Sequence, residues 1–454
     1  MNTLWQDLRN GMRMLLEHPA SLWIACVTLA LGLGVGAAIF NAAAQVPQID
    51  LSLARQYFIE AETLCTLDNG KLWGVSMCGP VLFVDPKTRA VAANQGDREG
   101  RLKSSGEVFI GNLPNQVNIA NTAVEWAGVK WTMIIWPLPA DQFDRARLMI
   151  HELWHRVQGQ IGLPSSMPAN SHLDSMDGRV WLQLEWRALE SALKSRGAQR
   201  RQAVSDALIF RAHRRTLFPK AAQEERALEM HEGLAEYSGV KLSGRPDVVQ
   251  SAARKLKEAE GNRSFVRSFA YVSGPAYGLL LDEAGSEWRK GLRPESDFGF
   301  LLQKAMALKP PSNIEQAIAK AAPRYDSDAL RASETEREND RRRRITAWRA
   351  RLVDAPALVI PVHQMNMGFD PNAPQPLDGL GTVYPTIRIV DTWGILTVSK
   401  GALINPTFSQ IRVPAPSDPS ARPIRSDGWT LELSAGWTLT PGERKGDFTL
   451  RKEN

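Results

Sequence analysis

The HELWH segment at residues 151–155 constrains this chain more than any other stretch. It is an HExxH motif inside the run Arg145–Gln158, whose residue pattern predicts a helix. Residues i and i+4 of a helix project from the same face, so the imidazoles of His151 and His155 can bind one metal ion. Glu152 can accept a proton from water at that metal. The sequence therefore predicts a metal site, and the alternative is two surface histidines on an amphipathic helix.

A segment with three glutamates, LEMHEGLAEY at residues 228–237, supplies candidates for a third metal ligand. It resembles the NEGxAEY helix of the gluzincin metallopeptidases, whose first glutamate in that phrase binds zinc. The resemblance implies that Glu232 is the third ligand, with His231 where the family usually has asparagine. Glu236 lies one turn later on the same face, so it is either the alternative ligand or a group that orients His151 or His155. A solvated helix face is the other interpretation of both carboxylates.

The run YVSGPAYGLLLD at residues 271–282 resembles the YxKGA…LLLD segment of the same peptidases. In that family the tyrosine donates a hydrogen bond to the oxyanion that forms when water attacks a carbonyl. The resemblance implies this role for Tyr271, with Tyr277 as the second candidate. A phenol O–H aimed at developing negative charge stabilises the transition state more than the ground state. Packing in an apolar helix is the alternative for both tyrosines.

The resemblance covers residues from about 130 to 285 and implies an α+β fold with a zincin (thermolysin-like), helix-rich catalytic core. It also implies Zn²⁺ as the cofactor and a peptide or protein as the substrate. The GxMEN sequence with which gluzincin aminopeptidases capture a free amine is missing before His151. The apolar run Val129–Pro137 stands there and predicts an edge strand that can pair with an extended peptide. Endopeptidase activity is therefore favoured, and His172, in a polar loop, could line the cleft.

The N-terminal segment predicts a membrane anchor. Ser21–Ala44 contains no charged residue, and its 24 positions suffice to span a bilayer as a helix. Arg9 and Arg13 precede it, which favours a cytoplasmic N-terminus and a catalytic region on the periplasmic or extracellular side. The stretch Leu4–Phe40 resembles the first membrane segment of macrolide-exporter-type ABC permeases. Signal cleavage after Ala44, which would release a secreted protein, is the alternative.

The sequence does not determine whether Cys65 and Cys78 form a disulfide. Cys65 and Cys78 flank a stretch in which Asp68-Asn69-Gly70 predicts a hairpin turn. Opposed cysteines on paired strands can form a disulfide in an oxidising compartment, whereas two buried free thiols are an equally ordinary outcome.

The layout predicted from composition has four parts. Residues 1–45 form the cytoplasmic stub with the anchor or signal sequence, and residues 46–140 a β-rich part of the catalytic region. Residues 141–350 form the helical zincin region, with a predicted helix at Val180–Arg196, and residues 351–454 a small antiparallel β-domain. In that domain the strands are expected at Thr386–Val390, Gly394–Val398 and Trp429–Leu433.

The charge pattern argues against nucleic acid as a partner. The net charge of +6 is spread along the chain, and the densest basic cluster, Arg341–Arg344, directly follows several acidic residues. Such mixed signs predict an exposed, ion-paired helix.

These features together favour a membrane-anchored, exported zinc metallopeptidase that hydrolyses peptide bonds. The alternative is a non-catalytic binding or assembly protein that retains a zincin fold. Because Glu152, His151 and His155 are all intact, the enzyme is favoured.

Overall fold

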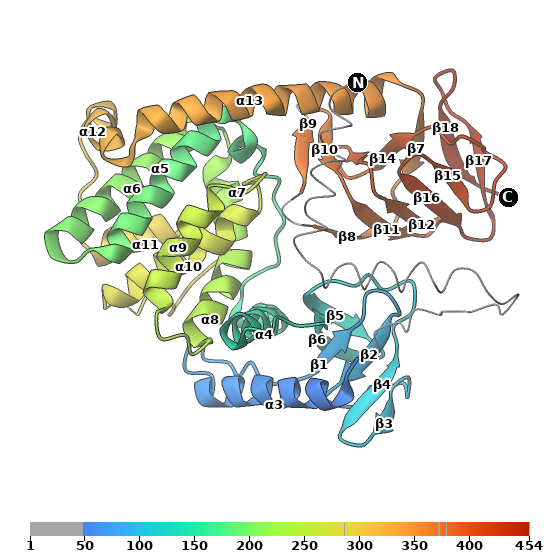
Figure 1. Ribbon diagram of the computed structural model, residues 1–454, viewed down its shortest axis with the longest axis horizontal. Coiled ribbons are helices and arrows are strands. Elements are labelled where there is room, and N and C mark those ends of the chain that lie inside the picture. The colour runs from blue at the N-terminus through green and yellow to red at the C-terminus, as the bar shows by residue number, and fades with distance from the viewer. Residues whose placement is uncertain (1–48, 286, 371–372, 378, 454) are drawn as a thin grey trace, which may run out of the picture. The chain divides into compact units, whose positions relative to one another are not determined.

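The computed structural model describes residues 49–285, 287–370, 373–377 and 379–453 (Figure 1). A helix and a six-stranded sheet come first in the described part of the chain, a helix-rich region follows, and two further sheets come last, which confirms the predicted α+β class. Within these residues no helix is both long and apolar enough to cross a bilayer. The predicted anchor Ser21–Ala44 lies outside the described residues.

Helix α3 (Leu51–Asp68) precedes the strands of the part predicted to be β-rich, and the hairpin predicted at Asp68-Asn69-Gly70 is wrong. Its buried side chains recur at helical spacing, at Ala54, Phe58, Ala61 and Cys65. Asn69 takes a left-handed conformation (φ 47°), and its N–H bonds the carbonyl of Cys65. The Asp-Asn-Gly sequence therefore ends a helix and does not join two strands.

Cys65 of α3 forms a disulfide with Cys78, whose Cα lies 5.2 Å from that of Cys65. The bond ties the end of α3 to the segment that leads into the first sheet.

The first sheet has the strand order β3-β4-β2-β1-β6-β5. Its strands are β1 (Val81–Val84), β2 (Ala90–Ala93), β3 (Lys103–Ser105), β4 (Val108–Asn112), β5 (Thr122–Trp126) and β6 (Val129–Ile135). The predicted edge strand, β6, is internal, since it pairs in parallel with β1 and antiparallel with β5. Its side chains are mostly buried on both faces, as is typical of an internal strand, so the prediction was wrong. Strand β5 forms the edge.

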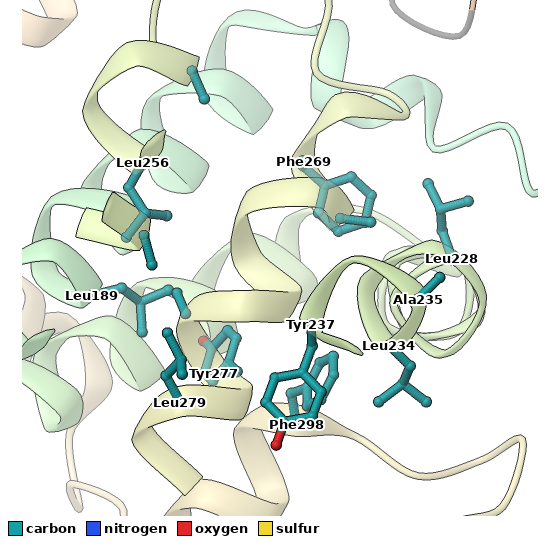
Figure 2. Close-up of a cluster of buried hydrophobic side chains, with 14 of the residues drawn as sticks. Leu189, Leu228, Leu234, Ala235, Tyr237, Leu256, Phe269, Tyr277, Leu279 and Phe298 are labelled. Atoms are coloured by element: carbon teal, nitrogen blue, oxygen red, sulfur yellow. The ribbon is translucent and has the colours of Figure 1, made fainter. Parts of the chain in front are cut away.

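The helical region confirms the helices predicted at the HExxH motif and near residues 180–196. Its helices are α4 (Gln142–Val157), α5 (Met176–Lys194), α6 (Gly197–Leu217), α7 (Ala221–Leu228), α8 (Leu234–Leu242), α9 (Val248–Ala259), α10 (Ser268–Glu283), α11 (Phe298–Ala305), α12 (Ile314–Ala321) and α13 (Ser327–Arg349), with a π-helical turn, η3 (Glu229–Gly233), between α7 and α8. Figure 2 shows part of the apolar core between them, including Leu189, Leu234 and Phe269.

Two glycines allow the helices around the HExxH motif to approach closely. A Cβ added at Gly239 of α8 would lie 2.4 Å from the carbonyl oxygen of Arg147 in α4. A Cβ at Gly274 of α10 would lie 2.4 Å from the Cα of Gly233 in η3. Because real Cβ atoms do not approach so closely, glycine is required where α8 meets α4 and where α10 meets η3.

The C-terminal strands form a seven-stranded sheet, β17-β18-β7-β14-β13-β10-β9, and a five-stranded sheet, β15-β16-β12-β11-β8. They are β7 (Ala357–Pro361), β8 (Asn366–Phe369), β9 (Gln375–Leu377), β10 (Gly381–Tyr384), β11 (Ile387–Asp391), β12 (Gly394–Val398), β13 (Ala402–Ile404), β14 (Gln410–Pro414), β15 (Ile424–Ser426), β16 (Trp429–Leu433), β17 (Trp437–Pro441) and β18 (Phe448–Lys452). The predicted strands correspond to β11, β12 and β16. Every pairing is antiparallel except that of β18 with β7.

Helix α13 is ion-paired, as its charge pattern predicts. Arg341 Nε lies 2.9 Å from Glu338, and Arg343 pairs with Asp340. The pattern did not reveal that Glu338 and Glu334 also bind the fully buried Arg179 of α5, at 3.1 and 2.5 Å.

Candidate metal centre

The side chains of His151, His155 and Glu232 converge and could hold a metal ion. Nε2 of His151 lies 3.1 Å from Nε2 of His155. Oε2 of Glu232 lies 3.4 Å from the first of these nitrogens and 3.3 Å from the second. The histidines come from α4 and Glu232 from the π-helical turn η3, a conformation that often occurs at functional sites.

Hydrogen bonds at Nδ1 determine which nitrogen of each histidine carries the proton. Nδ1 of His151 lies 2.8 Å from Oε2 of Glu236, and Nδ1 of His155 lies 3.1 Å from Oε1 of Gln158. The Gln158 amide is oriented by its Nε2, which donates to the carbonyl oxygen of Pro164 at 2.8 Å. Because both Nδ1 partners are acceptors, each Nδ1 must donate. Both Nε2 atoms can then present lone pairs to the same point.

The point where these atoms converge could hold a cation. Oε2 of Glu232 is buried, and no donor among the described residues reaches it with hydrogen-bond geometry. Two ligand atoms bound to zinc at about 2.0–2.1 Å and at the tetrahedral angle lie roughly 3.3–3.4 Å apart. The separations of 3.4 and 3.3 Å between Glu232 and the histidine nitrogens agree with that value. The three side chains therefore fit a bound metal ion.

The pKa values of His151 and Glu232 also indicate that the site favours positive charge. Burial opposes a charge on His151, but the nearby carboxylates of Glu232 and Glu236 outweigh it and raise its pKa to about 10. Burial likewise opposes ionisation of Glu232, yet His151 and His155 hold its pKa well below the usual range. A metal ion at this site therefore competes with protons for the same atoms.

Two arginines hold the carboxylates, and sequence reasoning missed both. Arg147 Nη1 donates to Oε1 of Glu236 at 2.7 Å, and Arg267 Nη2 donates to Oε1 of Glu232 at 3.0 Å. Arg147 and the likewise overlooked Gln158 share the helix face of His151 and His155, so helical spacing could have identified them. Arg267 precedes α10 in a non-helical segment and has no comparable sequence signal.

Glu152 lies beside the convergence point, and one of its carboxylate oxygens has no hydrogen-bond partner among the described residues. Its Oε1 is 4.0 Å from Nε2 of His151, and its buried Oε2 bonds to none of the described residues. Burial, the largest influence, raises the pKa of this carboxyl group. An unpartnered buried carboxylate at such a position is available to a ligand or to water.

The rings of Tyr271 and His151 are stacked, with their centroids 5.5 Å apart and 7° between their planes. Burial and the negative charge of Glu232 raise the pKa of Tyr271 well above its ordinary value. The phenol therefore keeps its proton and remains a hydrogen-bond donor at the edge of the site.

His231 forms part of the wall of the site. Its Nδ1 lies 2.9 Å from Oε1 of Gln158, the same atom that His155 contacts, and its Nε2 lies 3.4 Å from Ser165 Oγ. Burial, together with the nearby His155, lowers the pKa of His231 to about 3, so the imidazole is neutral.

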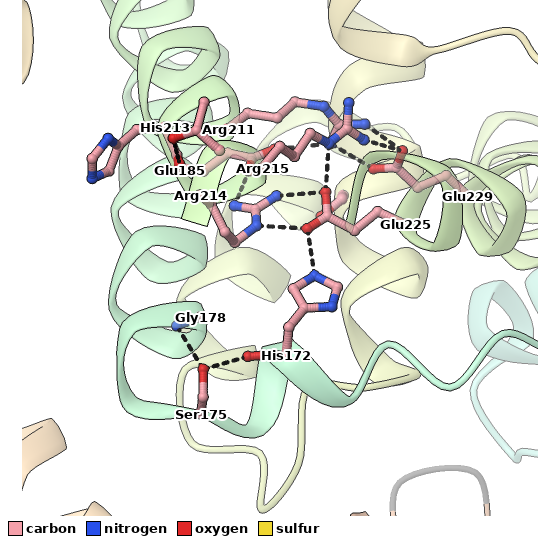
Figure 3. Close-up of polar contacts among 12 residues, drawn as sticks. His172, Ser175, Gly178, Glu185, Arg211, His213, Arg214, Arg215, Glu225 and Glu229 are labelled. Carbon is pink, nitrogen blue, oxygen red and sulfur yellow. Dashed lines mark hydrogen bonds and ion pairs between the residues drawn. The ribbon is translucent and has the colours of Figure 1, made fainter. Parts of the chain in front are cut away.

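Tyr277 and His172, the remaining sequence candidates, are not brought to the histidine pair. Tyr277 donates to Glu185 Oε1 at 2.7 Å, and His172 Nε2 lies 2.9 Å from Glu225 Oε1. Tyr277 follows Tyr271 by six positions, which turns it to a different face of α10. Figure 3 shows where His172 lies, in the buried arginine–glutamate cluster, which consists of Glu185, Arg211, Arg214, Arg215, Glu225, Glu229 and Asp297.

No protein-family model, curated protein or solved structure matches this chain.

Proposed function

We propose that this chain is a zinc metallopeptidase with a gluzincin-like, zincin-type core. The observation that carries the proposal is the convergence of His151 Nε2, His155 Nε2 and Glu232 Oε2, beside the unpartnered carboxylate of Glu152. Two histidines and one glutamate that leave a coordination position open are typical of catalytic zinc, whereas structural zinc sites have four protein ligands.

The chain's own residues have distinct parts in hydrolysis. A zinc ion held by the three ligands would supply a Lewis acid that polarises the carbonyl group and lowers the pKa of water. Glu152 accepts a proton from the attacking water and passes it to the leaving amine. Tyr271 keeps its proton and donates a hydrogen bond to the carbonyl oxygen as negative charge develops there. Glu236 and Gln158 keep His151 and His155 in the tautomer and orientation that bind the metal.

The substrate we propose is an extended peptide that pairs with strand β5. This strand is the edge of the first sheet, and α4, which carries His151 and His155, packs against both β5 and β6. An edge strand presents free backbone donors and acceptors, so a peptide can add as a further strand. Internal bonds of a polypeptide are then the expected targets, as in an endopeptidase.

The disulfide between Cys65 and Cys78 supports a location outside the cytoplasm, because disulfides persist mainly in oxidising compartments. Together with the apolar run Ser21–Ala44, it leads us to propose a catalytic region that faces the periplasm or the exterior. That region is held by the anchor or released after cleavage.

The proposal is tested by peptide hydrolysis with the purified full-length protein. Glu152→Gln should retain zinc but lose about 10²–10⁴-fold in kcat, the usual contribution of a general base. Glu287→Gln, whose side chain is 74% exposed, is the matched control and should keep full activity. If Glu152→Gln and the wild type hydrolyse peptides at equal rates, the catalytic role of Glu152 is refuted. Zinc binding without hydrolysis in the wild type would favour the non-catalytic binding or assembly protein.

A further inference from the structure

A cavity of about 260 Å³ lies against one face of α13. Its lining combines residues from α13, from the segment between α9 and α10, and from the C-terminal strands: Arg263, Arg344, Ala347, Trp348, Arg351, Gln375 and Pro385. None of these described lining residues is acidic, although three of them are arginines. The cavity is therefore a concentrated positive site without a counter-charge in its own wall.

Helical spacing brings the cavity's α13 residues together. Arg344, Trp348 and Arg351 stand at positions i, i+4 and i+7 and so share a face across α13 and the turn that continues it. The neighbouring Arg343 is different, because it pairs with Asp340 and its side chain is 74% exposed. Trp348 is held by its Nε1, which donates to Oε1 of the buried Gln375 at 3.2 Å.

The arginines of the cavity carry unsatisfied donors. The Nε atoms of Arg344 and Arg351 are buried, and no acceptor in the described part of the chain reaches either of them. Arg351 uses its outer nitrogens to contact Asp427, at 3.3 Å to the carboxylate and 2.6 Å to the carbonyl oxygen. Burying a charged donor without an acceptor is costly, so a ligand that supplies acceptor oxygens would be favoured beside these arginines.

We propose that this cavity binds a small oxyanion, a phosphate or carboxylate group, between Arg344, Arg351 and Arg263. Guanidinium groups bind such oxygens through paired, charge-assisted hydrogen bonds. One water takes about 30 Å³ of liquid volume, so the cavity has room for a small oxyanion with several waters. The indole of Trp348 forms an apolar wall beside them. The inference is independent of the metal centre and of the proposed peptidase activity.

The test compares Arg344→Gln with Arg343→Gln in the full-length chain, at constant ionic strength. Both variants remove one positive charge from adjacent positions of α13, but only Arg344 lines the cavity. Inorganic phosphate and acetate are titrated separately by calorimetry, and thermal unfolding is measured with each anion, with chloride as the reference. The two titrations distinguish a phosphate site from a carboxylate site.

We expect saturable binding of at least one of these anions to the wild type and to Arg343→Gln, together with a rise in Tm. Arg344→Gln should bind that anion about tenfold more weakly or worse, because a charge-assisted pair is lost. If neither anion binds the wild type saturably, the proposal is overturned. It is equally overturned if Arg344→Gln and Arg343→Gln respond alike, since binding would then reflect net charge alone.

Discussion

Two of the buried polar clusters among the described helices are satisfied in different ways. In the arginine–glutamate cluster, Glu225 accepts from Nε and Nη2 of Arg214 at 2.7 and 2.9 Å. Glu229 accepts from both outer nitrogens of Arg211, at 2.8 and 2.5 Å. In the candidate metal centre, Nε2 of His151 and of His155 converge on Glu232 Oε2, which no donor among the described residues reaches with hydrogen-bond geometry.

This difference in hydrogen bonding indicates a structural role for the arginine–glutamate cluster and a functional role for the candidate metal centre. Where every buried acid faces a guanidinium, the protein's own groups neutralise one another and no ligand is needed. Burial opposes ionisation of Glu225, yet Arg214 and Arg215 hold its pKa well below the usual range. Where acceptors converge on one another, a bound cation could supply the positive charge that the cluster favours. The cavity beside Arg344 shows the opposite imbalance, because the buried Nε donors of Arg344 and Arg351 lack an acceptor among the described residues.

Breaking the satisfied cluster should have the largest effect on stability. Arg214→Met leaves Glu185 and Glu225 buried without their main partner, and should lower the free energy of unfolding by about 3–5 kcal/mol. Urea unfolding measures the change. The exposed control Arg343→Met should stay within about 0.5 kcal/mol of the wild type. A loss below about 1 kcal/mol in Arg214→Met would show that the cluster does not stabilise the fold as described.

Changing the carboxylates of the metal centre should affect metal affinity in a fixed order. Glu236→Gln removes the charged acceptor at Nδ1 of His151 and should weaken zinc binding about 10–100-fold. Glu232→Gln removes a ligand atom and should weaken binding further. Titration against a competing chelator measures both values. The reverse order would mean that Glu236 is the ligand and Glu232 the orienting group.

Substitution of one tyrosine of α10 should affect activity, and substitution of the other should affect stability. Tyr277→Phe loses the hydrogen bond to Glu185 and should cost about 1–3 kcal/mol of unfolding free energy while zinc binding stays unchanged. Tyr271→Phe should leave stability within about 0.5 kcal/mol but reduce kcat, because it removes the donor beside His151. Urea unfolding and peptide hydrolysis are measured on both variants. If Tyr277→Phe is the variant with reduced kcat, the two roles have been exchanged.

The sequence predicted those parts of the molecule that depend on local pattern. Helical spacing correctly placed the helix of the HExxH motif and the helix near residues 180–196, and alternating runs placed β11, β12 and β16. His151 and His155 needed only the i, i+4 spacing of one helix to share a face. The charge pattern of α13 likewise predicted its ion pairs correctly.

The predictions that failed depend on which neighbours each segment meets. Nothing local in Val129–Ile135 tells that β5 lies beyond it, so an internal strand was taken for an edge. The turn-like Asp-Asn-Gly, predicted to join two strands, in fact ends helix α3. Arg267 comes from a non-helical segment and reaches Glu232 only because the tertiary fold brings them together. Such contacts have no signature in a single sequence.

Metal analysis of the purified protein tests directly whether His151, His155 and Glu232 bind a metal ion. We expect about one zinc per chain in the wild type and in Glu152→Gln, which keeps all three ligands. His155→Ala, which removes one converging nitrogen, should retain almost none. A wild type without stoichiometric zinc after purification in its presence, or a His155→Ala variant that still holds it, would contradict the account.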